Sequence, residues 1–278
     1  MSKVSEVPEV PMIFSGKKSM VLVVLLLLLG IPFKGMAAER QIQGGLVQRE
    51  SRIYFETGFE ALSRDVTQEE TQFAGLIFPG QTTSVQSLRL LAKLGVRVAD
   101  PLEIYAIEGG SDLQIDEFGF NSSMLGIYGG GARVILFREH DPRAPYQIFL
   151  DYRFLRSNTH DTVLFKPKDD NGDILTGGGQ GELLRETIRW TEHTIKFGVQ
   201  GRHFEYEPYG GVRFSFVNAT DHLPSQMQHL NVDLKQRDTF GLFVGTRYYL
   251  SPSEQAALFI EGSIIDQFSL AGGIRVSY

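Results

Sequence analysis

Histidines beside acidic residues, and one pair of adjacent acidic residues, occur at several places in the chain. These are His160-Asp161, Asp169-Asp170 and Asp221-His222, with His229 nearby. A histidine beside an acidic residue, joined by a nucleophile or a second acidic pair, is the residue set of a protease or lipid hydrolase. Adjacent residues of a strand point to opposite faces, so these pairs do not converge by themselves. We interpret them as polar residues on solvated loops and expect no catalytic residues.

The segment Lys166–Glu182 (KPKDDNGDILTGGGQGE) has the composition of a calcium loop. With Gly172 as the loop glycine, Pro167 stands where an aspartate is required and Gly178 where a bidentate glutamate is required. The Asn-Gly step instead favours a tight hairpin turn. The sequence also shows no zinc-ligand spacing, phosphate-binding glycine loop or hydrolase elbow. We therefore expect neither a metal nor a cofactor.

A second pattern is Gly-x-Arg followed by an apolar or aromatic residue. It occurs at Gly95-Val96-Arg97, Gly131-Ala132-Arg133, Gly211-Val212-Arg213, Gly245-Thr246-Arg247 and Gly273-Ile274-Arg275. In a strand the glycine and arginine share one face, and the middle residue lies on the other. A glycine leaves room for a long side chain in a narrow interior. The pattern predicts arginines inside a barrel and middle residues facing lipid.

The elements that must position these residues show period-two alternation between turn signals. They are residues 52–63, 87–98, 102–110, 127–138, 146–157 (with a continuation towards 165), 186–200, 206–217, 239–250, 257–264 and 267–278. Segments of about 9–12 residues match tilted membrane-spanning strands. We predict an all-β fold, a closed antiparallel transmembrane up-and-down barrel of about ten strands, with eight or twelve as alternatives.

The connections alternate in length, as they do in bacterial outer-membrane barrels. We expect short turns near 99–101, 139–145, 201–205 and 251–255, long loops near 64–86, 111–124, 158–183 and 218–238, and a last short turn at 265–266. An even number of strands places both termini on the short-turn side. This pattern predicts a periplasmic location for the two ends of the barrel domain.

The N-terminal segment has the features of a secretory signal peptide. Lys17 and Lys18 precede the apolar run Met20–Leu29, and small residues follow up to Ala38. The run is too short to span a bilayer as a helix. We predict a cleaved leader at 1–38, a short periplasmic segment at 39–50 and the barrel domain at 51–278.

Composition narrows the possible partners. The formal net charge is −6, and removing the leader makes it more negative, because the leader holds four lysines and two glutamates. An acidic chain without clustered cations is a poor partner for nucleic acid. The chain contains no cysteine, so an exported protein of this sequence must be stabilised without disulfides. A closed hydrogen-bonded barrel would provide that stability.

The segments GGARVIL, GGVRFSF, VGTRYYL and GGIRVSY, together with the leader and the terminal Tyr278, carry a resemblance. Residues 50–278 resemble small bacterial outer-membrane barrels of the OmpA and OmpX type, although ten strands differ from the eight of that group. The resemblance implies an outer-membrane location, contact with lipid and lipopolysaccharide, a monomeric state, and folding by periplasmic chaperones and the outer-membrane assembly machinery. It also implies that the last strand is an assembly signal, formed by Leu270, Gly272, Ile274, Val276 and Tyr278.

The residues assigned to the inner face form a set of mixed charge. They are Glu56, Glu60, Arg89, Lys93, Arg97, Glu103, Arg133, Asp151, Arg153, Arg213, Arg247, Glu261 and Arg275. A barrel of this size is nearly filled by side chains, and buried charges must pair. We expect a salt-bridged interior and a structural or surface-interaction role in the cell envelope. The alternatives are a small anion-preferring pore and, third, a rim-located hydrolase.

Overall fold

The computed structural model describes residues 53–68, 71–73, 76–78, 82–115, 120–139, 145–165, 182–222, 232–250 and 255–278. The predicted leader, the segment 39–50, Asp169, Asp170 and His229 lie outside these residues. No helix in the described ranges is long and apolar enough to cross a membrane. The described chain is all β.

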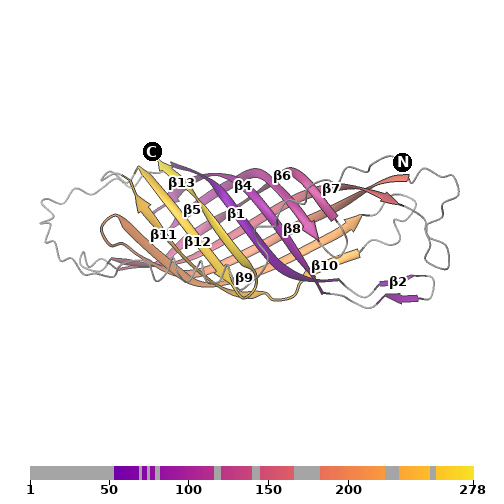
Figure 1. Ribbon diagram of the computed structural model, residues 1–278. Helices are drawn as coiled ribbons and strands as arrows, with labels where there is room; N and C mark the ends of the chain where they lie inside the picture. Colours follow the sequence, from indigo (N-terminus) through magenta and orange to yellow (C-terminus); the bar gives the residue numbers. More distant parts are fainter. Residues whose placement is uncertain are drawn as a thin grey trace, which may run out of the picture. The chain divides into compact units, whose positions relative to one another are not determined.

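Ten antiparallel strands form one closed wall (Figure 1). They are β1 (Ile53–Gln68), β4 (Thr82–Ala99), β5 (Leu102–Ile115), β6 (Phe120–Arg138), β7 (Tyr146–Phe165), β8 (Glu182–Gly201), β9 (Tyr206–His222), β11 (Phe240–Tyr249), β12 (Ala256–Ile264) and β13 (Phe268–Ser277). The barrel closes because β1 pairs with β4 on one side and with β13 on the other. This confirms the predicted fold class and the count of ten.

We call the end at which β1 begins and β13 finishes the proximal end, and the opposite end the distal end. The short strand β10 (Val232–Gln236) pairs with β9 and with β1 near the distal end. It lies beyond the β12–β13 hairpin, which turns at Ile265. Among the described strands, the wall therefore narrows from ten strands at the proximal end to eight at the distal end. A separate hairpin joins β2 (Thr71–Phe73) to β3 (Leu76–Phe78).

Several strands extend further towards the distal end than predicted. Regions expected to be long loops contain paired strand residues: β1 continues to Gln68, β5 reaches Ile115, and β6 begins at Phe120. The predictions of long loops near 64–86, 111–124 and 158–183 are wrong to this extent, and the loop near 218–238 contains β10. The reason is that a membrane needs only about ten residues of each strand, whereas the wall is longer than that.

Each long strand changes what it buries part-way along its length. In the proximal half of β1, Phe55 and Phe59 point outward and are 42% and 44% exposed. In the distal half, Leu62 and Val66 point inward and are buried, while Ser63 lies on the outer face. The alternation itself continues without interruption. Only the polarity of the two faces is exchanged.

The distal half of the barrel is filled by apolar side chains. They come from seven strands and form one core: Val66, Val85, Leu113, Ile115, Phe120, Ile188, Trp190, Val217, Ala219 and Leu234. Trp190 points inward because β8 pairs with β7 and β9 without a bulge, which leaves Phe197 and Val199 on the outer face. The expectation of an interior filled mainly by paired charges is wrong for this half.

Candidate functional site

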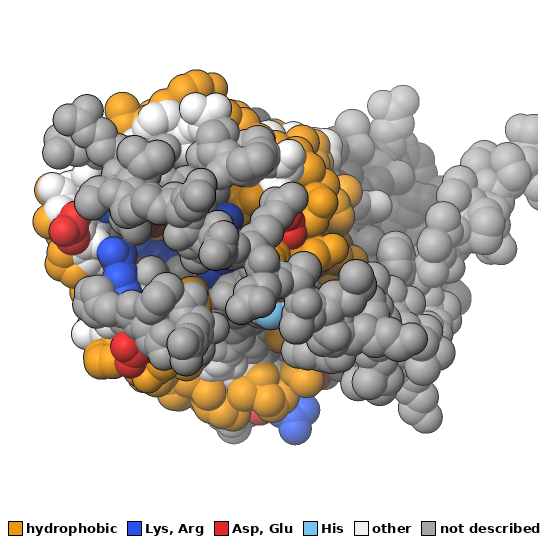
Figure 2. Space-filling model, turned by 90° about the vertical axis from the view of Figure 1, so that its left-hand side faces the viewer, with side chains coloured by type: hydrophobic (Ala, Val, Ile, Leu, Met, Phe, Trp, Pro, Cys, Tyr) orange, Lys and Arg blue, Asp and Glu red, His pale blue; other side chains and the backbone are white. Residues whose placement is uncertain are grey.

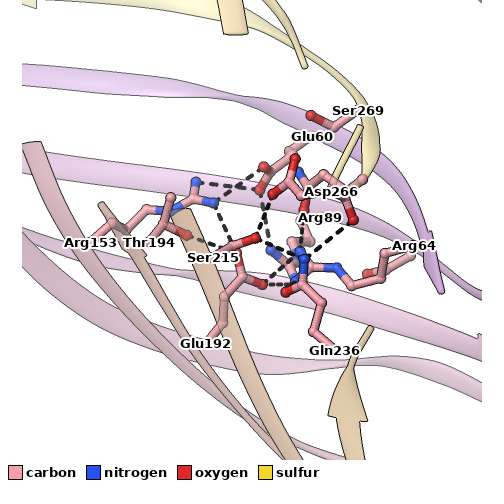
Figure 3. Close-up of polar contacts among 12 residues, drawn as sticks. Glu60, Arg64, Arg89, Arg153, Glu192, Thr194, Ser215, Gln236, Asp266 and Ser269 are labelled. Atoms are coloured by element: carbon pink, nitrogen blue, oxygen red, sulfur yellow. Dashed lines mark hydrogen bonds and ion pairs between the residues drawn. The ribbon is translucent and has the colours of Figure 1, made fainter. Parts of the chain in front are cut away.

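A buried ion network lies in the lumen, on the proximal side of the apolar core, and Figure 3 shows its polar contacts. Glu192 of β8 is its centre and is fully buried. Its carboxylate accepts hydrogen bonds from Arg64 at 3.0 Å, Arg89 at 2.9 Å and Arg153 at 3.2 Å. Glu60 of β1 pairs with Arg89 and Arg153, each at 3.3 Å. Three arginines thus share two carboxylates. Arg64, Arg89 and both carboxylates are buried, and Arg153 is partly exposed.

The tip of the β12–β13 hairpin joins this network. Asp266 is buried and lies 3.0 Å from Nε of Arg213. Ser215 donates to Asp266, and the side-chain amide of Gln236 in β10 donates to the backbone carbonyl of Asp266 at 3.2 Å. The neighbouring Gln267 accepts a hydrogen bond from Arg64. Polar contacts therefore hold the shorter hairpin against β10 at the place where the wall narrows.

A cavity of about 130 Å³ opens on the proximal side of the network. Two lysine–glutamate pairs line it: Lys93 lies 4.0 Å from Glu56, and Lys196 pairs with Glu261. Aromatic rings complete its wall: Tyr105, Phe149, Tyr209 and Phe243. The hydroxyl of Tyr105 donates to Asp151 at 2.6 Å, so this carboxylate is bound by a phenol. The cavity has the space and polarity to hold water.

Four arginines of the Gly-x-Arg pattern surround the proximal mouth. They are Arg97 of β4, Arg133 of β6, Arg247 of β11 and Arg275 of β13. Two glutamates accompany them, since Arg97 pairs with Glu103 at 3.0 Å and Arg247 pairs with Glu207. Figure 2 looks at this end and shows basic side chains inside a ring of hydrophobic ones.

The structure places all thirteen predicted inner-face residues in the network, around the cavity or at the mouth, and each of them is buried or partly buried. Most of the predicted carboxylates form an ion pair with a cation, whereas Asp151 accepts a hydrogen bond from Tyr105. Among the predicted arginines, Arg133 contacts Gln200 and the ring of Phe149, and Arg275 lies over the ring of Tyr54. Arg213 belongs to the network and not to the mouth.

Sequence reasoning missed several members of the site: Arg64, Glu192, Lys196, Glu207 and Asp266. A parity count along β8 and β9 would have found three of them, because they share a face with Trp190 or with Arg213. Arg64 follows the last residue of the predicted first strand, and Asp266 lies in a predicted turn. No alternation signal marks those two positions.

The histidine–carboxylate pairs lie in strands, so their interpretation as loop residues is wrong. His160 and Asp161 belong to β7, and Asp221 and His222 end β9. His160 meets the hydroxyl of Thr187 at 3.0 Å, whereas Asp161 accepts the backbone N–H of Asn121 at 2.9 Å. The first pair therefore does not converge on a common point. Within the described ranges, no three metal-ligating side chains could hold an ion.

No protein family and no curated protein matches the sequence. Among solved structures, the chain is similar to the outer membrane protease OmpT from Escherichia coli, with 12% identity, a TM-score of 0.48, and coverage of 84% of this chain and 99% of that one. The chain is also similar to the translocator domain of the autotransporter NalP from Neisseria meningitidis, with 9% identity and a TM-score of 0.41. That match covers 94% of this chain and 97% of the translocator domain. The match to the transport unit of the autotransporter AIDA-I from Escherichia coli has 10% identity and a TM-score of 0.37. It covers 85% of this chain and 94% of the transport unit.

The chain's own architecture is that of an outer-membrane β-barrel. Its strands are antiparallel, its wall is closed, and an outward apolar band surrounds the proximal half. These are the features by which a barrel satisfies its backbone groups within lipid.

Proposed function

We propose that this chain is an integral outer-membrane barrel that is closed to solutes and serves a structural or surface-interaction role. The observation that carries the proposal is the filling of the lumen by two successive layers. The ion network around Glu192 occupies the middle, and the apolar core around Trp190 occupies the distal half. Ions would have to cross both layers, and moving a charge through an apolar core is costly.

The exchange of polarity along the strands supports a position of the membrane around the proximal half of the barrel. Exposed apolar side chains, such as Leu94, Leu150 and Phe197, lie in the proximal half. The outer face of the distal half carries residues such as Asn158 and Asn218, which are exposed and suited to water. In this arrangement the proximal mouth opens to the periplasm and the distal wall projects from the cell. The projecting wall is the surface available for contact with other molecules.

Single-channel recording in planar bilayers tests closure. The purified chain, refolded in detergent and added at concentrations at which a general porin inserts and conducts, should give no discrete current steps. The porin in the same bilayers is the positive control. Reproducible steps of one size, with anion selectivity, would overturn the closed barrel. They would favour the second candidate, a small anion-preferring pore, which the cavity and the arginines of the mouth support.

We also propose that the role is not enzymatic. The contacts of His160 and Asp161 with different neighbours support this view. Peptide and lipopolysaccharide turnover should be absent from the parent protein. Turnover that is lost in His160→Ala or His222→Ala would instead establish a rim hydrolase.

The remaining expectations are part of the same proposal. They are the membership of the OmpA/OmpX-type group, a cleaved leader, contact with lipopolysaccharide, a monomeric state, and folding by periplasmic chaperones and the assembly machinery. Cell fractionation with mass spectrometry of the N-terminus tests location and cleavage together. Release of the protein by a carbonate wash, without detergent, would contradict a membrane barrel.

A further inference from the structure

Two arginines lie side by side on the outer face of the barrel, where β7 pairs with β8. Arg156 of β7 lies opposite Thr191 of β8, and Arg189 lies two residues from Thr191 on the same face of β8. Diagonal neighbours on one face of an antiparallel pair are about 7–8 Å apart, a distance that long side chains can span. The register therefore brings both guanidinium groups within reach of one small group placed beside Thr191.

The two arginines lie directly beyond the apolar band of the outer face. One step nearer the proximal end, that face carries Phe154, His193 and Phe216 side by side on β7, β8 and β9. The hydroxyl of Tyr152 meets Nδ1 of His193 at 2.8 Å. Aromatic side chains with a polar end are typical of the boundary between lipid and water. In the orientation proposed above, the arginines are therefore at the level of the outer-leaflet headgroups.

Neither Arg156 nor Arg189 forms an ion pair within 4.0 Å with a carboxylate of the described chain. The Nε atom of Arg156 is out of contact with solvent and has no hydrogen-bond partner among the described residues. Asp161, further along β7, accepts the backbone N–H of Asn121 instead. The outward residues around the two arginines are polar and neutral: Asn158, Thr191, Asn218 and Thr220.

The acidic residues of the neighbouring outer wall lie further away. Glu108 of β5 is two strands from Arg156. On β10, also two strands away from β8, Asp233 and Lys235 carry opposite charges, and Asp233 accepts a hydrogen bond from Thr220 at 2.9 Å. Two strand spacings amount to about 10 Å, which is beyond the screening length at physiological salt. The described outer face of β7 and β8 therefore keeps an excess of positive charge.

We propose that Arg156 and Arg189 bind the phosphate group of a lipid in the outer leaflet. Each guanidinium presents a fork of N–H donors that matches two oxygens of a phosphate. The apolar band directly below would contact the acyl chains of the same lipid, which favours a lipid over a free phosphate ion. The site rests on the membrane position proposed above. It gives the expected contact with lipopolysaccharide a place and a chemical group, the phosphate of its lipid A part.

Native mass spectrometry of the full chain in detergent micelles tests the site. The probes are lipid A with its phosphates and the same lipid A after the phosphates are removed. We expect one tightly bound lipid A per chain and at least tenfold weaker binding of the phosphate-free lipid. Inorganic phosphate at an equal concentration should not displace lipid A. Displacement would assign the site to free phosphate and overturn the lipid.

Arg156→Gln and Arg189→Gln should each weaken the binding of lipid A about tenfold, because each removes a charged donor pair. Arg189→Lys keeps the charge but loses the fork, so it should lose less. Arg237→Gln is the matched control, because it removes one exposed arginine from the wall beyond β10 and leaves β7 and β8 unchanged. Variants are compared only when their heat-modifiable mobility on a gel matches that of the parent.

A photo-crosslinker gives a second readout that leaves both arginines in place. The chain has no cysteine, so one introduced cysteine directs the label. A label at Asn158→Cys, opposite Arg189, should capture lipid A, whereas a label at Ser63→Cys on the outer face of β1 should capture much less. This comparison decides the question if the glutamine variants fail to fold.

Three results would overturn the site. The first is a parent protein that binds both forms of lipid A equally tightly. The second is folded Arg156→Gln and Arg189→Gln variants that bind as tightly as Arg237→Gln. The third is equal capture of lipid A from the two labelled positions. All of these measurements use the purified chain, so they are separable from the conductance and fractionation tests of the proposed function.

Discussion

The two halves of the barrel wall are built from the same strands but bury opposite kinds of side chain. In the proximal half, apolar residues such as Phe197 face outward, and the charges around the cavity face inward. In the distal half, Trp190 and Ile188 face inward, and polar residues face outward. The difference shows that the fold fixes only the alternation of faces. The medium on each side of the wall decides which face is apolar.

The ion network marks the boundary between the halves, and its disruption should have the largest effect. Glu192→Gln removes a charge that compensates Arg64 and Arg89 in a fully buried position. We expect the free energy of unfolding to fall by about 3–5 kcal/mol. Urea-induced unfolding in lipid vesicles, followed by gel mobility, measures it. The control is Glu261→Gln, whose partner Lys196 lies beside the cavity and can be solvated. Equal losses of unfolding free energy in the two variants would contradict a special role of the buried network at the boundary between the halves.

A matched pair on β8 compares the two halves directly. Ile188 is buried in the apolar core, and Ile195 lies on the outward face with Phe197. Ile188→Ala should cost about 2–5 kcal/mol, because a cavity adds to the lost transfer free energy. Ile195→Ala should cost less, since lipid chains can fill the space. The same unfolding assay measures both. A larger loss of unfolding free energy for Ile195→Ala than for Ile188→Ala would show that lipid contact stabilises the barrel more than the apolar core does.

The hairpin tip between the halves contains a strained residue. Ile265 has a φ of 87°, which a β-branched side chain rarely adopts. Ile265→Gly should raise the free energy of unfolding by up to about 1 kcal/mol by releasing this strain. Ile264→Gly, at an ordinary φ in β12, is the control and should lower it. A loss of stability in both variants would show that the side chain of Ile265 contributes more than its strain costs.

The smallest effect is expected in a quenching experiment on the parent. Trp190 is the single tryptophan of the sequence, and it lies in the distal core. Lipids with brominated acyl chains should hardly quench its fluorescence, because the barrel wall separates it from the membrane. Phe197→Trp in a Trp190→Phe background moves the probe to the lipid-facing side and should be quenched strongly. Similar quenching of both probes would contradict the inward position of Trp190.

The sequence predicted the proximal half better than the distal half. Along β1, Ile53 to Phe59 alternate apolar and polar residues as a lipid-facing strand requires, and the prediction of a strand there is confirmed. Beyond Leu62 the same alternation has reversed polarity. A search for apolar residues on the lipid side therefore stops at that point, although the strand continues to Gln68.

The network was only partly predictable for a different reason. Glu60, Arg89 and Arg153 follow from parity, but their pairing with Glu192 depends on how strands far apart in the chain meet across the lumen. β10 has five residues, too few for a periodic signal. The narrowing of the wall that it produces, and the burial of Asp266 beneath it, follow from strand pairing alone.

By itself, the sequence determined the closed antiparallel barrel, its ten strands and the repeated inner arginines, because alternation and turn spacing are local properties. Only the tertiary structure decided which charges meet and where the lumen is filled. Those properties depend on distances across the barrel, which strand register and curvature set. The first histidine–carboxylate pair shows the same division. The sequence placed His160 beside Asp161, and the fold directed them to different partners.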